Sequence, residues 1–170
     1  MSRKRTVFVF VLHAVFLIFI FIVQSMILPH IFARGSIPVI LPLTAAGVAL
    51  FEGGVRGGVF GLMSGILCDI SFNQSVMLFT VLLTIVGLLV GLVSETLIAQ
   101  GFPSFILTSI VILALTAFAQ MFSLLFFRGV AFSALLPVAL GQTIISLFFA
   151  VPIYFMTRAL GRTTQRADNR

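Results

Sequence analysis

Apolar residues fall into six long runs, and short polar segments rich in Pro, Gly, Asn or charged residues separate the runs. A helix of about 20 apolar residues crosses a bilayer, and most of the runs approach that length. We therefore predict an all-α integral membrane protein with six transmembrane helices. The predicted spans cover residues 6–28, 37–51, 55–70, 76–93, 105–127 and 131–156. They form one domain over residues 1–157, followed by a basic, polar cytoplasmic tail at 158–170 that we expect to be disordered.

The second and third predicted spans are short for a crossing. The turn EGGVRG joins them and places Glu52 and Arg56 four residues apart. The pair forms either two short spanning helices or a re-entrant hairpin. We favour spanning helices, because the flanking residues extend both runs toward 20 residues.

Glycine recurs at every fourth position of the third span and again in the fourth. The third span carries Gly53, Gly57, Gly61 and Gly65 and then Asp69, and the fourth carries Gly87, Gly91 and then Glu95. Residues four apart share one face of a helix, and in lipid a small-residue face lets two backbones approach closely. The pattern predicts a helix-packing surface that ends in a carboxylate. The surface packs against the chain's own neighbouring helices, a partner's helix or a second copy of the chain.

Uncharged polar residues interrupt the other spans. His13 and Gln24 lie in the first span, Gln120 in the fifth and Gln142 in the sixth. Polar side chains within a span face protein rather than lipid. For His13 we favour a helix–helix hydrogen bond over a proton relay. We regard Gln24 and Gln142, with Asp69 and Glu95, as the candidate functional polar residues.

Composition and charge agree with a membrane protein. The chain has 170 residues, of which 61% are apolar, ten are basic and four are acidic. A water-soluble fold of this size cannot hide so much apolar surface. The basic residues flank the spans and form no aromatic-studded patch of the kind that binds nucleic acid, so the expected surroundings are membrane lipid and other membrane proteins.

The distribution of basic residues predicts the topology. With six spans, eight Lys and Arg residues lie on the side of the termini and two, Arg34 and Arg128, lie on the other side. The positive-inside rule then places both termini in the cytoplasm. Asp69 lies near the outer face, where Arg34 or Arg128 would pair with it. Glu95 lies near the inner face, where Arg56 or Arg158 would pair with it.

No catalytic, cofactor or metal site is predicted. Cys68 is the single cysteine, which excludes an intramolecular disulfide and a cysteine metal cluster. The chain lacks HExxH, GxSxG and phosphate-binding loop motifs, and no loop is long enough for a catalytic domain. We expect a protein that is not an enzyme.

Three segments resemble one family. IPVILPLTAAGVALFEGGVRGGVFGLMSGILCDI is similar to the central segment of the rod shape-determining membrane protein MreD, with a glycine-spaced span that closes on Asp69. VQSMILPHI resembles the end of that family's first span, and ISLFFAVPIYFMTRALGR resembles its last span.

The resemblance implies a scaffold in the inner membrane that takes part in cell-wall elongation and peptidoglycan synthesis. Its implied partners are the bitopic scaffold MreC and, through it, MreB, RodA and a penicillin-binding transpeptidase. It also implies a bundle similar in fold to the S components of energy-coupling-factor importers. A vitamin-binding S component is therefore the alternative function, although the outer polar residues that would line its pocket are few. They are His30, Arg34, Asn73, Gln74 and Arg128.

Overall fold

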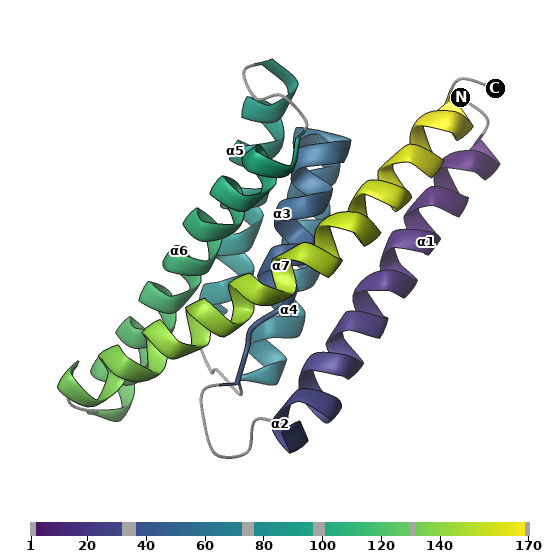
Figure 1. The fold of residues 1–170 in the computed structure, drawn as a ribbon. Helices are drawn as coiled ribbons and strands as arrows, with labels where there is room; N and C mark the ends of the chain where they lie inside the picture. Colours follow the sequence, from purple (N-terminus) through teal and green to yellow (C-terminus); the bar gives the residue numbers. More distant parts are fainter. Residues whose placement is uncertain (1–2, 32–36, 73–76, 97–100, 130–131, 169–170) are drawn as a thin grey trace.

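The protein is a bundle of helices, and Figure 1 shows its arrangement. The computed structural model describes residues 3–31, 37–72, 77–96, 101–129 and 132–168, and no strand occurs within these ranges. The elements are α1 (Arg3–Ile22), the π-helix η1 (Val23–Ile27), α2 (Leu28–Ile31), α3 (Leu41–Glu52), α4 (Gly54–Ser71), α5 (Leu78–Thr96), α6 (Phe102–Arg128) and α7 (Phe132–Asp168). The first three follow one another without a break, so each of the six predicted ranges contains a helix.

The short helix α3 lies at the centre of the bundle. Its residues from Leu41 to Phe51 are all buried, and α4, α5, α6, α7 and α1 contact it. A helix that is apolar on every side is a core helix. Small residues allow its neighbours to approach: a Cβ built on Gly47 would lie 2.7 Å from the side chain of Thr157 on α7.

Helices α3, α4 and α5 run up, down and up beside one another. Gly53 makes the turn between α3 and α4 with a φ of 87°, a left-handed conformation that favours glycine. Gly57 of α4 packs on Ala49 of α3, and the same glycine packs on Gly87 of α5. These contacts make α4 the middle member of an antiparallel three-helix unit.

The glycine row of α4 lies directly against the backbone of α5. A Cβ on Gly57 would lie 2.6 Å from the carbonyl oxygen of Gly87, and a Cβ on Gly65 would lie 2.5 Å from the Cα of Thr80. On the other side, a Cβ on Gly91 would lie 2.5 Å from the carbonyl oxygen of Gly53. Carbon atoms cannot come this close, so the two helices meet along their glycines without side chains between them.

The longer helices surround this unit, and both ends of the chain lie at one end of the bundle (Figure 1). Large apolar side chains are exposed along α1, α5, α6 and α7. Within the described residues, four stretches are long and apolar enough to cross a membrane, namely Phe10–Ile31, Leu78–Glu95, Phe102–Phe126 and Leu135–Gly161. The fold is therefore that of an all-α, multi-pass membrane protein.

The helices differ from the predicted segments at two places. The second helix begins at Leu41, not at residue 37, because residues 37–40 are not helical and the backbone amides of Val39 and Ile40 bond to side chains of other helices. The predicted disordered tail is helical as far as Asp168, because α7 continues without a break. At about 1.5 Å per residue, the 37 residues of α7 extend over roughly 55 Å, well beyond the apolar thickness of a bilayer.

We expect Gly61→Ala to destabilise the protein by about 1–3 kcal/mol, because the added methyl group meets the rigid carbonyl of Leu83. Gly58→Ala is the matched control on the same helix: its Cβ lies 3.1 Å from the flexible side chain of Leu88, which can move aside. Thermal unfolding in detergent measures the difference, with a thiol-reactive dye that reports exposure of the buried Cys68. Equal melting temperatures for the two variants would contradict the packing described here.

Candidate functional site

The two carboxylates that end the glycine rows each bind the first turn of the opposite helix. Asp69, near the end of α4, accepts hydrogen bonds from the backbone amides of Phe79 (3.2 Å) and Thr80 (2.9 Å) and from the hydroxyl of Thr80 (2.6 Å). Asp69 is buried, with 7% of its surface exposed. It thereby acts as the N-cap of α5, although it comes from another helix.

Glu95 has the same function at the other end of the helical hairpin that α4 and α5 form. It lies near the end of α5, and its Oε1 atom accepts a hydrogen bond of 2.8 Å from the backbone amide of Gly54, the first residue of α4. A Cβ on Gly53 would collide with this carboxylate. Unlike Asp69, Glu95 is exposed. Each helix of the hairpin therefore supplies an acidic cap for the positive end of the other.

Gln24 has the corresponding position at the start of α3. Its Oε1 accepts hydrogen bonds from the backbone amides of Ile40 (2.7 Å) and Leu41 (2.9 Å). Ser146 of α7 assists by accepting a hydrogen bond of 2.8 Å from the amide of Val39. Gln24 lies in the π-helical segment η1, a local widening of the helix that is frequent at functional positions.

A buried ionic cluster lies at the other end of α3. One oxygen of Glu52 is 3.1 Å from Nε2 of His13 on α1, and the other is 3.0 Å from Nη1 of Arg56 on α4. The side chains of Glu52 and His13 are only 2% and 1% exposed. Because exposed apolar surface gives little attraction between helices in lipid, such polar contacts are an effective way to fix α1.

The described partners of Asp69 and Glu95 belong to helix starts, and the pairing of Asp69 with Arg34 or Arg128 stays a prediction. Asp69 has backbone amides and a hydroxyl as its partners, while Arg34 and the side chain of Arg128 lie outside the described residues. The contact of Glu95 is with Gly54, and Arg158 instead donates a hydrogen bond of 3.0 Å to the hydroxyl of Tyr154. Helix ends compete well for carboxylates because several amides converge there.

The predicted glycine positions come together on one interface inside the chain. Gly53, Gly57, Gly61 and Gly65 face α5, and Gly87 and Gly91 face α4. Of the alternatives that the sequence leaves open, this is packing against the chain's own neighbour. A partner helix or a second copy of the chain would have to contact another surface, because α5 already covers this one.

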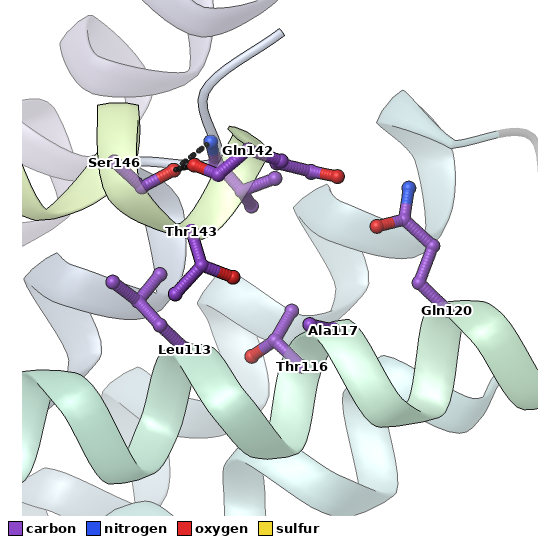
Figure 2. A pocket seen from close by; sticks show the side chains of 8 residues that line it. Leu113, Thr116, Ala117, Gln120, Gln142, Thr143 and Ser146 are labelled. Carbon is purple, nitrogen blue, oxygen red and sulfur yellow. Dashed lines mark hydrogen bonds between the residues drawn. The ribbon is translucent and has the colours of Figure 1, made fainter. Parts of the chain in front are cut away.

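Gln142 lies elsewhere, at a small polar pocket between α6 and α7 (Figure 2). Figure 2 shows Gln120 and Gln142 extending from the two helices toward the same space, with Ser146 bonded to the Gln142 carbonyl and the Val39 amide. The volume is about 10 Å³, room for about one water molecule. Gln142 therefore faces a space for about one water molecule between α6 and α7.

Sequence reasoning missed two further parts of the polar network. Glu52 lies at the predicted turn, but nothing in the sequence places it against His13, 39 positions earlier. The helix–helix hydrogen bond favoured for His13 is confirmed, and its partner is the carboxylate of Glu52. Tyr154, near the end of the last predicted span, is buried among Phe51, Phe102 and Phe105. The described residues bring together no group of three His, Cys, Asp or Glu side chains that could hold a metal ion.

Comparisons with family profiles, with curated proteins and with solved structures find no match.

Removing the two caps is expected to have unequal effects. Asp69→Ala leaves two backbone amides and a hydroxyl without an acceptor in a buried place, which costs on the order of 3 kcal/mol. Glu95→Ala costs about 1 kcal/mol, because Glu95 is exposed and makes one such bond. Melting monitored at Cys68 measures both losses. If a charge swap between Asp69 and Arg34 restored the stability of Asp69 variants, capping would not be the source of the effect.

The buried cluster is expected to behave as a coupled unit. Glu52→Leu leaves His13 and Arg56 without their shared acceptor, and breaking a buried pair in this way costs about 3–5 kcal/mol. His13→Leu combined with Glu52→Leu removes two members together and should cost less than the sum of the single changes. A double-mutant cycle on the same melting assay measures this coupling. Strict additivity would show that the two side chains act independently.

Proposed function

We propose that this protein is a non-catalytic scaffold subunit of the cell-wall elongation complex, of the MreD kind. It would cross the inner membrane six times, with both termini in the cytoplasm. It would bind an MreC-like bitopic protein and, through that partner, connect to MreB, RodA and a penicillin-binding transpeptidase. The likeness of its sequence to the MreD family, carried by the segments around α3, α4 and α7, is the starting point for this proposal.

One observation carries the proposal furthest: the three acidic side chains that the structure describes hold helices together. The chain has four acidic residues. Asp69 and Glu95 cap the helices of the hairpin, and Glu52 joins α3 to α1 and α4. An ion or proton pathway uses acidic groups that exchange partners, whereas these groups have fixed structural partners. The arrangement favours a rigid body that other proteins bind.

Six crossings agree with the position of the chain ends. The termini lie at the same end of the bundle (Figure 1), as an even number of crossings requires. In this interpretation α3 and α4 are short crossing helices, and the non-helical residues 37–40 complete the path of α3 across the membrane. The basic residues concentrated near the two termini support a cytoplasmic position for that end.

The partner's single transmembrane helix has a suitable groove between α5 and α6. The groove has a volume of about 470 Å³ and is lined by apolar side chains alone among the described residues. They are Met77, Leu78, Val81, Leu82, Ile85, Val86 and Leu115. A single-span partner presents a helix without a hydrophilic face, and a groove in the lipid-facing surface lets such a helix gain close van der Waals contact.

Site-specific photo-crosslinking in cells tests the proposal. A photoreactive residue at Val81 or Ile85, which are 58% and 54% exposed in the groove, is expected to crosslink to the MreC-like protein. The matched control is Phe148, which is 80% exposed on α7 and outside the groove, and it should give no such product.

Two results would contradict the proposal. If neither groove position captures the bitopic protein while the chain remains folded and abundant, the protein does not bind that partner there. If the captured proteins are the energising subunits of an importer, the S-component alternative is the correct function. Depletion of the protein should round rod-shaped cells if it is the proposed scaffold subunit, and it should leave their shape unchanged if it is an S component.

A further inference from the structure

An open pocket lies at the end of the bundle away from the termini, where η1 and α2 meet the end of α4. Its volume is about 380 Å³, within the range of small-ligand sites. Nine described residues line it: Phe21, Gln24, Ser25, Pro29, Ile37, Pro38, Ile70, Ser71 and Phe72. This pocket is separate from the contact between α4 and α5, from their acidic caps and from the apolar groove between α5 and α6.

One hydrogen-bond donor in the pocket is held in a fixed orientation. Gln24 is only 4% exposed, and its Oε1 accepts hydrogen bonds from the amides of Ile40 and Leu41. With the oxygen held by two donors, the Nε2 group must point away from α3. No described residue accepts a hydrogen bond from Nε2.

The free donor opens into the pocket rather than into the core. Among the described residues, the fully buried side-chain polar atom without a partner is Oγ of Ser109, so Nε2 of Gln24 is in contact with accessible space. The accessible space that Gln24 lines is this pocket. Beside it, the hydroxyls of Ser25 and Ser71 lie 3.2 Å apart and bond to each other.

The rest of the lining that the structure describes is apolar and uncharged. Phe21 and Phe72 supply aromatic surface, and the remaining apolar residues are Pro29, Ile37, Pro38 and Ile70. None of the described lining residues carries a charge, and these residues therefore favour an uncharged group beside them. The chemistry is that of an apolar cleft with one oriented amide donor and a pair of hydroxyls.

We propose that this pocket binds a neutral amphipathic molecule whose carbonyl or hydroxyl oxygen accepts a hydrogen bond from Nε2 of Gln24. The apolar body of the molecule packs between Phe21 and Phe72. The shared chemistry has two sources, the acyl ester of a membrane lipid or a small solute that enters from outside. The inference is independent of the scaffold function, because the pocket and the proposed partner groove involve different helices.

Photolabelling of the full-length protein in phosphatidylethanolamine vesicles tests the proposal. The two probes are a diazirine-bearing monoacylglycerol, which represents a lipid ester, and a diazirine-bearing phenylacetamide, which represents a small solute. At least one probe is expected to label the segments 21–29 and 70–72 in preference to the lipid-exposed face of α5. The probe that labels identifies the source.

Gln24→Glu is the decisive variant. It keeps an oxygen for the Ile40 and Leu41 amides, and its negative charge suits the start of a helix, but it replaces the donor by an acceptor. Labelling of the pocket should fall about tenfold, the effect of losing one hydrogen bond of about 1.4 kcal/mol. Gln142→Glu makes the same chemical change outside the pocket and should leave labelling unchanged.

A second variant is needed if Gln24→Glu unfolds at a lower temperature than the wild type in the Cys68 assay. Ser71→Leu fills the pocket from the side of α4 without changing a helix cap, and it should also abolish labelling. Equal labelling of the wild type and both variants would overturn the proposal, as would labelling spread evenly over the lipid-facing helices.

Discussion

The direct contact between the backbones of α4 and α5 is the constraint on which the rest of the fold depends. Because no side chain separates the two helices at Gly57, Gly61 or Gly87, each helix end reaches the first turn of the other. Only at this separation can Asp69 cap α5 and Glu95 cap α4. A wider hairpin would leave carboxylates and amides without partners in an apolar environment, where each is costly.

Hydrogen bonds and ion pairs also attach α1 and its continuation η1 to the rest of the bundle. Apolar side chains gain little free energy by moving from lipid to protein, so polar contacts stabilise the attachment of this helix. They occur at three levels: His13 binds Glu52, Gln24 binds the start of α3, and Ser25 bonds to Ser71. Polar atoms of the first helix thereby locate the central helix at both of its ends.

Much of this arrangement could be predicted from spacing, and the remainder depends on backbone groups that a sequence does not display. Glycines four apart, closing on Asp69, specify a packing face because helical geometry aligns them. The identity of the facing helix is not specified, since every apolar span is an eligible neighbour. Asp69 and Gln24 accept hydrogen bonds from backbone amides, which every residue type except proline possesses, so the sequence does not single out these partners. The predicted second span begins before α3 because residues 37–40 are apolar, yet the amides of Val39 and Ile40 bond to side chains of other helices.

The exchange of caps within the hairpin bears on how the chain enters the membrane. During synthesis α4 emerges first, carrying a carboxylate and a strip of uncovered backbone that have no complement until α5 follows. A carboxylate at the centre of a membrane-spanning helix costs about 2.5–3.5 kcal/mol, and the hydrogen bonds that Asp69 accepts from the start of α5 offset part of such a penalty. Entry of α4 and α5 into the bilayer as a single unit is thus the low-energy route. The length of the segment that connects them sets the delay between the synthesis of α4 and that of α5.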